Sequence, residues 1–449
     1  MSVPPLEPDG LVAAGIHTVI IATPDLQGRL AGRRIPVERF ADAVEAGVDI
    51  CLSVWSWDIA QSTELIDADR LELCGAHNGV PDATMLPDLS TLRRAAWLDG
   101  VAICLADVVD ATTREPLPIA PRGILRAELE RLEAAGFTAS VGTELEFYLF
   151  RNEPRRLRQS GFRDLEPTTL VPADFMIHEG DVYEQFFRSL RERLEASDVP
   201  IEAAQSELGR GQWELTFSHD EPLRIADRHA LYKLAVRDMA ATAGYSVTFM
   251  AKPLGDQPGS SCHIHASLRA SDGTAAFFAP GAQNGMSDTM RHAVAGVMRH
   301  AGDLASWYAP TVNSYRRFAA DQVVGGSGFW GIDNRTAAVR VVGSSASSKR
   351  FEMRVGGADA NPYLALTALL ASARDGIENG LALPPARTAA FTLPAHLGEA
   401  TTRLASSALA QSILPAVALD HLTTLSSFEW EVFLRSVSDW DRDRYFDRI

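Results

Sequence analysis

Four short segments of this 449-residue chain each combine an apolar face with a charged face, and they restrict the fold more than any other feature. The first is VGTELEFYLF, residues 141–150, whose Phe, Tyr, Leu and Val content predicts a strand. Because side chains alternate along a strand, Glu144 and Glu146 share one face and the apolar side chains share the other. Two carboxylates at this spacing repel each other unless a cation or water separates them. For one such segment alone, a solvated edge strand is the commoner explanation.

The same alternation recurs in GQWELTF (211–217), SCHIHASL (261–268) and RFEMRV (350–355). Taken singly, HxH is compatible with a satisfied core histidine, and RxExR with an exposed ion-paired face worth under ~1 kcal/mol. Four unrelated coincidences in one chain are less expected than one shared site. If the strands belong to one curved sheet backed by helices, their polar faces line one concavity. The polar faces carry Glu144, Glu146, Gln212, Glu214, Thr216, His263, His265, Ser267, Arg350, Glu352 and Arg354.

Such a concavity predicts a site for Mg²⁺ or Mn²⁺. Carboxylate oxygens with one imidazole suit these ions better than zinc, which prefers His and Cys. Converging carboxylates without a metal would raise one another's pKa values by several units. Two divalent ions relieve that repulsion and can bridge phosphate oxygens, while arginines complement anionic substrate groups.

The composition indicates an ordinary globular protein, with 46% hydrophobic and 22% charged residues. A formal net charge of −16 argues against nucleic acid or an anionic membrane as a partner. The four cysteines show no metal-binding spacing and suggest reduced thiols. The start MSVPPLEPDG is unlike a signal peptide, and no apolar run approaches ~20 residues. We therefore expect a soluble cytoplasmic protein.

The order of elements predicts an α+β protein of two domains. Short β-like runs such as HTVIIATPD and VDICLSVW (48–55) alternate with Gly- and Pro-rich turns up to about residue 110. A loop at 111–123 precedes a helix that Gly136 closes, and further helical runs lie at 181–197, 228–244 and 361–380. We expect an N-terminal domain over 1–112 and a larger domain over 113–449.

Six ordered motifs resemble those of the glutamine synthetase family: GTELEF, ELGRGQWE, GSSCHIH, NSYRRF, NRTAAVR and KRFEMR followed by ANPYL. PDLQGRLAGRRIP (24–36) and MLPDLSTLRRAAW (85–97) match more loosely. The resemblance implies a β-grasp-like N-terminal domain and a catalytic domain with a curved antiparallel sheet backed by helices. It also implies a homo-oligomer of stacked rings, such as a dodecamer, with each active site at a subunit junction.

The resemblance further implies that ATP activates the γ-carboxylate of L-glutamate as γ-glutamyl phosphate, which an amine then attacks. Phosphoryl transfer of this kind depends on positioning and charge neutralisation. By motif position, one metal ion would be held by Glu146, Glu207 and Glu214, and the other by Glu144, His263 and Glu352. Glutamate would contact Gly259, Arg317 and Arg354. ATP would contact His265, Ser267, Arg335, Arg340 and Arg350, with Arg335 also catalytic.

The chain departs from ammonia-using relatives around the amine. Those relatives carry FDGSS and a PGYEAP flap, whose Asp, Ser and Glu cradle ammonium. Here VWSWDIAQST (54–63) keeps Asp58 but has Gln61 in place of the serine. The flap Phe318–Trp330 contains no glutamate, and Val323 occupies its position; the candidates to replace it are Asp321 and Gln322.

Losing an anionic residue disfavours a small cation and leaves a roomier mouth for a larger amine, with Asp58 holding or deprotonating it. We therefore expect a γ-glutamyl amine ligase acting on ethanolamine, an alkylamine or a polyamine, because the spelling of the motifs is closest to the ethanolamine- and polyamine-type branch. The alternatives are an ammonia-using glutamine synthetase and a non-catalytic member with a structural or regulatory role.

Overall fold

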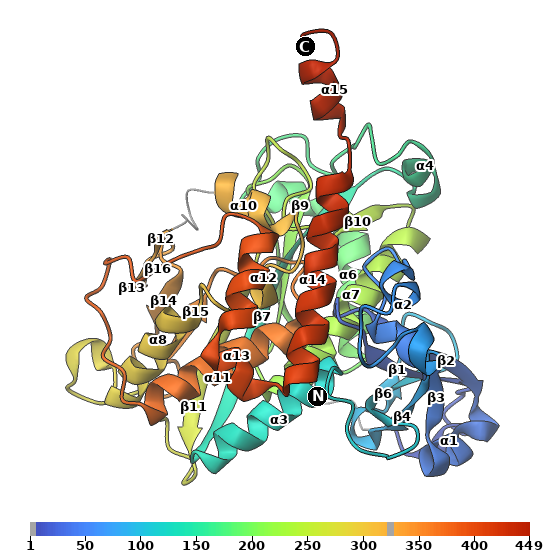
Figure 1. The fold of residues 1–449 in the computed structure, drawn as a ribbon, viewed down its shortest axis with the longest axis horizontal. Coiled ribbons are helices and arrows are strands. Elements are labelled where there is room, and N and C mark those ends of the chain that lie inside the picture. Colours follow the sequence, from blue (N-terminus) through green and yellow to red (C-terminus); the bar gives the residue numbers. More distant parts are fainter. Residues whose placement is uncertain (1–5, 321–326) are drawn as a thin grey trace.

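The computed structural model describes residues 6–320 and 327–449, in which helices surround two large β-sheets (Figure 1). The predicted α+β class is confirmed. The described helices are α1 (Phe40–Ala46), α2 (Glu64–Asp67), α3 (Pro121–Ala134), α4 (Pro154–Gln159), α5 (Ile177–Asp181), α6 (Glu184–Glu195), α7 (Pro222–Thr242), α8 (Asp288–His300), α9 (Ala305–Tyr308), α10 (Ser314–Ala320), α11 (Pro362–Glu378), α12 (Leu397–Ser406), α13 (Ala408–Ile413), α14 (Ala416–Arg435) and α15 (Asp439–Tyr445).

The first sheet is built within the first 110 residues and has the order β2-β1-β6-β4-β3, with β5 paired to β6. Strands β1 and β6 run parallel, and the other pairs are antiparallel. The β-like run 48–55 is a strand only to Cys51, because the chain then turns through a 3₁₀ helix that buries Trp55. The strands are β1 (Thr18–Pro24), β2 (Leu30–Pro36), β3 (Val48–Cys51), β4 (Asp82–Pro87), β5 (Arg93–Arg94) and β6 (Val101–Asp110).

The second sheet has the order β13-β14-β15-β11-β7-β9-β8, with β10 also paired to β7. Its strands are β7 (Phe137–Phe150), β8 (Ile201–Ser206), β9 (Gln212–Phe217), β10 (Ser246–Thr248), β11 (Cys262–Ala270), β13 (Trp330–Ile332), β14 (Val339–Val342) and β15 (Arg350–Met353). A separate small pair joins β12 (Ser327–Gly328) to β16 (Phe391–Thr392).

The four segments with one charged face are neighbours in this second sheet, in the order β15-β11-β7-β9, and all their pairings are antiparallel. In register, Glu144 lies opposite His263, and Glu146 lies opposite Glu214. Side chains of directly opposed residues point to the same face of a sheet. The predicted shared sheet is therefore confirmed, and the register gathers the charged groups on one face.

The apolar face of this sheet is covered by helices. Helices α3 and α7 lie against β7, and α11 packs on α3, α7 and α8 (Figure 1). Helix α11 begins as its sequence predicts, because the Asn361 side chain accepts a hydrogen bond from the backbone N–H of Tyr363 and Pro362 takes the first helical position. Leu145 and Phe147 are fully buried on this face, which excludes a solvated edge strand.

A buried ion cluster joins the first sheet to the helical layer. Arg122 in α3 is 1% exposed, and its guanidinium lies 2.7 Å from Asp88, 2.5 Å from Asp107 and 3.1 Å from Asp227 of α7. The predicted domain boundary at 112/113 falls between β6 and α3, near these contacts, and it stays a prediction.

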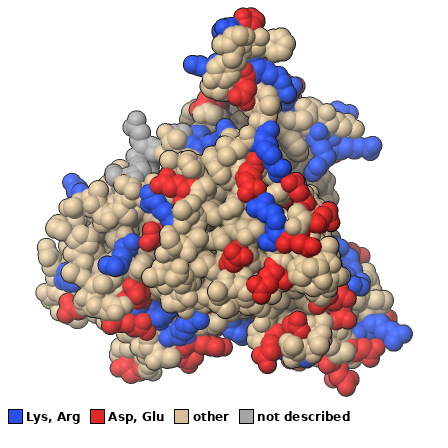
Figure 2. Space-filling model, viewed as in Figure 1, with Lys and Arg blue, Asp and Glu red and all other residues tan. Residues whose placement is uncertain are grey.

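The C-terminal helices lie across the front of the molecule in Figure 1, where α12 and α14 are side by side and α15 projects beyond the rest. Basic and acidic side chains are interspersed over this face (Figure 2). Within residues 6–320 and 327–449, no helix combines the length and the apolar character needed to cross a membrane.

Candidate active site

Three metal-ligating side chains from neighbouring strands meet on the charged face of the second sheet. Ligand atoms of Glu144, His263 and Glu352 all lie within 4.8 Å of one another. The His263 Nδ1 atom is 3.2 Å from a carboxylate oxygen of Glu144 and 3.5 Å from one of Glu352. Glu352 is only 1% exposed. Two carboxylates and one imidazole form an oxygen-rich donor set suited to Mg²⁺ or Mn²⁺.

A second group of carboxylates lies beside the first. Glu146 and Glu214 are opposed across β7 and β9, and both are buried. Glu207 follows β8, and the amide of Gln205 donates to Glu207 at 3.0 Å and to Glu214 at 3.3 Å. The chain thus brings three carboxylates together, with one amide bridging two of them.

The negative charge of this second group is not neutralised by the groups around it. Burial, together with repulsion from the neighbouring Glu144 and Glu146, raises the pKa of Glu214 to about 10. Burial and repulsion from Glu146 raise the pKa of Glu207 to about 8. These groups cannot all be ionised at neutral pH unless positive charge lies between them. The residues present therefore fit a divalent cation.

In the first group, side chains of the chain itself stabilise the ionised carboxylates. Burial alone would raise the pKa of Glu144, but hydrogen bonds from His263 and His265 outweigh it and hold that pKa well below its usual value. For Glu352, burial is likewise outweighed by His263 and Arg354, so its pKa is lowered. The guanidinium of Arg354 donates directly to Glu352. The two groups of carboxylates thus differ in how much positive charge the chain itself supplies.

The position of Glu146 is set by three hydrogen bonds, and two of them come from Ser261, which the sequence did not single out. Ser261 donates to it twice, from its backbone N–H at 2.8 Å and from its hydroxyl at 2.5 Å. The amide of Gln212 donates a third hydrogen bond at 2.9 Å. Such partners orient metal ligands. Gln205, which donates to the other two carboxylates of this group, could have been found because it lies two residues before Glu207 in the sequence. Nothing in the sequence marked Ser261 beyond its place in the GSS motif.

A cavity of about 400 Å³ adjoins the second group of carboxylates, and three residues predicted to contact glutamate line it: Gly259, Arg317 and Arg354. Arg317 is buried and donates to the carbonyl oxygen of Val355 at 3.0 Å. A Cβ atom on Gly259 would lie 2.7 Å from the Arg317 side chain, so only glycine permits this approach.

A cavity of about 360 Å³ opens on the other side of Glu144, and His265, Ser267 and Arg350 line it. Arg350 donates to Nδ1 of His265 at 3.1 Å, so that Nδ1 is the acceptor and Nε2 carries the proton toward Glu144, 2.8 Å away. Three residues predicted to contact ATP thus share one cavity, which borders the cluster at Glu144.

The remaining predicted residues differ in how close they lie to the cluster. Arg340 reaches it, donating to Glu352 at 3.0 Å and to Asp333 at 2.5 Å. Arg335 is exposed in the turn between β13 and β14 and has no hydrogen bond or ion pair to the described residues. Asp58 lines neither cavity beside the cluster but a third one.

Val323, at the position of the missing flap glutamate, and the two candidates to replace that glutamate, Asp321 and Gln322, lie outside the described residues. Gln61, which stands in place of the ammonium-contacting serine, adopts a left-handed backbone conformation with φ of +63°. The backbone of Gln61 therefore has a conformation found in turns and not in helices or strands.

Comparison with known proteins identifies the family. The profile described as the glutamine synthetase catalytic domain matches residues 118–445. The chain belongs to the glutamine synthetase family. The family predicted from six motifs is thus confirmed, and the match spans all four charged strands of the second sheet.

Relatives within the glutamine synthetase family match the chain over nearly its whole length. A gamma-glutamylethanolamide synthetase of Streptomyces coelicolor is 38% identical, covering 99% of this chain and 97% of the relative. A glutamate–isopropylamine ligase of a Pseudomonas species is 32% identical, covering 97% and 96%. The solved structure titled "Apo GmaS without ligand" superimposes with a TM-score of 0.85 at 25% identity, covering 99% of this chain and 100% of that one.

Proposed function

We propose that this chain is an ATP-dependent ligase that joins the γ-carboxylate of L-glutamate to an organic amine through γ-glutamyl phosphate. The observation that carries the proposal is the cluster of Glu144, His263 and Glu352, with three further carboxylates beside it, between two cavities. The names of two relatives, an ethanolamide synthetase and an isopropylamine ligase, support a carbon–nitrogen ligase that uses an organic amine.

Two divalent ions, Mg²⁺ or Mn²⁺, fit the cluster. Glu144, His263 and Glu352 would hold one ion, and Glu146, Glu207 and Glu214 the other. When bound, such ions neutralise charge on the phosphates of ATP and on the transferring phosphoryl group. The raised pKa values of Glu207 and Glu214 support this assignment, because a cation would let both carboxylates ionise.

The remaining roles follow the two cavities. Arg317 and Arg354, with Gly259 beside them, would bind the carboxylates of glutamate, and Arg354 is oriented for this by its contact with Glu352. ATP would occupy the opposite cavity. There it would contact His265, Ser267 and Arg350, which line the cavity. Arg340, which donates to Glu352, would also contact ATP, and Arg335 would reach the phosphoryl group.

Amine recognition falls to Asp58, which would hold the ammonium group and accept its proton before attack. We further propose a homo-oligomer of stacked rings with active sites at subunit junctions. The projecting helix α15 supports an assembly, since Trp440 is 59% exposed and Phe446 is 86% exposed. The four thiols are free, which agrees with the cytoplasmic location expected from the sequence.

An amine panel tests the substrate. Purified protein is incubated with ATP, glutamate, Mg²⁺ or Mn²⁺, and one of ammonia, ethanolamine, butylamine or putrescine, and phosphate release is measured alongside mass spectrometry of the amide. We expect the highest kcat/KM with an organic amine. A higher kcat/KM for ammonia than for every organic amine would identify an ammonia-using glutamine synthetase instead.

The variant Glu352→Ala separates an enzyme from a non-catalytic family member. An enzyme should lose metal-dependent phosphate release, while Glu133→Gln, an exposed carboxylate on α3, should keep it. Circular dichroism of both variants shows whether Glu352→Ala stays folded. If the wild-type protein releases no phosphate with any amine and any metal, the chain is not this ligase.

A further inference from the structure

One wall of the cavity predicted to bind glutamate is a loop. Residues 252–259 lie between β10 and β11 and form no helix or strand, and six of the 14 residues that line the cavity belong to them. The backbone polar groups of this loop have no partner strand, so contacts from side chains must fix their positions. How the loop is held therefore decides the shape of this cavity of about 400 Å³.

Three successive carbonyl oxygens of the loop, those of residues 257–259, each accept a hydrogen bond from a different side chain. The ammonium group of Lys252 donates to the first, the hydroxyl of Tyr148 to the second at 2.7 Å, and the amide of Gln212 to the third at 3.1 Å. A carbonyl oxygen that turned toward a bound carboxylate would repel it, and these contacts prevent such a turn. They thus hold the loop in one backbone arrangement.

The charged sheet places Tyr148 for this contact. Tyr148 lies two residues after Glu146 on β7, so its side chain is on the same face of the sheet, and it is fully buried. A Cβ atom at Gly209 would clash with the Tyr148 hydroxyl, so only glycine leaves room for that group. Burial, with the nearby Glu146, raises the pKa of Tyr148, so the hydroxyl stays protonated and can donate to the loop.

The Tyr148 hydroxyl differs from the other two donors because it serves the loop alone. It forms no second hydrogen bond within residues 6–320 and 327–449. Lys252 belongs to the loop itself, and the amide of Gln212 also donates to Glu146 at 2.9 Å. Replacing Tyr148 with phenylalanine therefore removes one anchor of the loop and leaves the hydrogen bonds of the carboxylate cluster in place.

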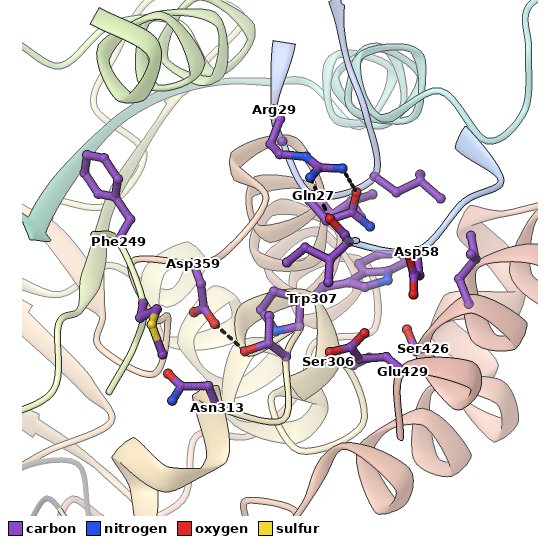
Figure 3. Close-up of a pocket in the computed structure, with 18 of the residues that line it drawn as sticks. Gln27, Arg29, Asp58, Phe249, Ser306, Trp307, Asn313, Asp359, Ser426 and Glu429 are labelled. Carbon is purple, nitrogen blue, oxygen red and sulfur yellow. Dashed lines mark hydrogen bonds between the residues drawn. The ribbon is translucent and has the colours of Figure 1, made fainter. Parts of the chain in front are cut away.

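The loop is also tied to the helix that carries a predicted glutamate ligand. Asn313 directly precedes α10, and its amide pairs with the backbone of Lys252, accepting from the N–H at 2.8 Å and donating to the carbonyl oxygen at 2.9 Å. Asn313 lies in the wall of a third cavity, of about 630 Å³, which Asp58 and Glu429 also line (Figure 3). Four residues further on, the side chain of Arg317 approaches the end of the loop so closely that only glycine fits there. Loop and helix are thus joined at two points, and a change in the loop also reaches Arg317.

We propose that Tyr148 is a positioning residue for glutamate, because its hydroxyl holds loop 252–259 in the arrangement that places Gly259 beside Arg317. That the ligand of this cavity is glutamate rests on the proposed function. A wall that is already ordered lets the substrate bind without the free-energy cost of ordering it. Since this wall is the same before and during the reaction, losing its anchor weakens the binding of substrate and transition state equally, which raises KM and leaves kcat unchanged.

Tyr148→Phe tests this role, with Tyr183→Phe as a matched control. Tyr183 is also buried, and its hydroxyl also donates to a backbone carbonyl, that of Thr168 at 2.6 Å, but it lines neither cavity beside the carboxylate cluster. In steady-state kinetics we expect Tyr148→Phe to raise KM for glutamate about 5-fold, which corresponds to the loss of one neutral hydrogen bond. KM for ATP and kcat should stay unchanged, and Tyr183→Phe should change none of these constants. Thermal unfolding of each variant establishes that it is folded.

Calorimetric titration of L-glutamate in the presence of Mn²⁺, without ATP or amine, measures the same effect in the absence of turnover. We expect Tyr148→Phe to bind glutamate about 5-fold more weakly than wild type, and Tyr183→Phe to bind it equally well. A folded Tyr148→Phe protein with wild-type affinity, an equal rise in KM for glutamate and for ATP, or a wild type that binds no glutamate would each overturn the role of Tyr148. If glutamate binding changes as expected but wild type forms no amide with any amine, the proposed function is refuted while the role of Tyr148 in binding glutamate stands.

Discussion

Replacing Glu214 with glutamine should stabilise the metal-free protein. Glu214 is buried beside other carboxylates, and burial with that repulsion raises its pKa from the usual 4.5 to about 10. At pH 7 the side chain is ionised in the unfolded chain and protonated in the folded chain. Folding must therefore take up a proton at this position, and glutamine, which has a similar shape and no charge, removes that requirement.

The magnitude follows from the pKa change. Each pH unit above the unfolded pKa costs about 1.4 kcal/mol of folding free energy, so wild type loses about 3 kcal/mol at pH 7 through this one group. The folded state binds one more proton than the unfolded state between pH 4.5 and pH 10. This contribution to stability is thus absent below pH 4.5 and grows more unfavourable as the pH rises toward 10.

Thermal unfolding in EDTA, followed from pH 5 to pH 9, measures this difference. We expect Glu214→Gln to unfold a few degrees above wild type at pH 7, with the gap narrowing toward pH 5. Glu133→Gln, whose carboxylate is exposed, should follow wild type at every pH. Added Mn²⁺ should stabilise wild type more than Glu214→Gln. A Glu214→Gln protein that is less stable than wild type in EDTA at pH 7, or equally dependent on pH, would refute this reasoning.

Three further substitutions test the packing around the site. Gly259→Ala should raise KM for glutamate more than KM for ATP, because its Cβ atom would lie 2.7 Å from the Arg317 side chain; an equal change in both constants would contradict that role. Ser261→Ala should weaken Mn²⁺ binding roughly 10-fold in calorimetry, since Glu146 loses one of its donors, and unchanged affinity would show that the hydroxyl does not orient it. Arg122→Met should lower the free energy of unfolding by about 3 kcal/mol in urea titrations, because it leaves the buried carboxylate of Asp227 without its cation. A variant as stable as wild type would show that the cluster contributes no net stability.

Much of the second sheet could be predicted from alternation alone. Strand periodicity placed Glu144 and Glu146 on one face of β7, and the same rule applied to β9, β11 and β15. Helix α11 was predictable from Asn361 and the proline that follows it. The prediction of a β-like run over 48–55 was only half right, because the strand ends at Cys51. Trp55 is buried by contacts with remote segments of the chain, which local periodicity does not reveal.

The roles of individual carboxylates could not be predicted, since they depend on what each one meets. Glu352 and Glu214 look alike in the sequence, each flanked by apolar residues on a strand. In the fold, Glu352 receives His263 and Arg354, whereas Glu214 meets other carboxylates. Their pKa values therefore move in opposite directions.

The sequence by itself determined the family, the strand faces and the kind of donor atoms that the site offers, because side-chain alternation and motif spacing are local properties of the chain. Only the tertiary structure decided which carboxylates are compensated and which require a cation. It alone brought Glu429, from a C-terminal helix, into the same cavity as Asp58. Distance and burial set the strength of electrostatic interactions, and both arise only when remote segments pack together.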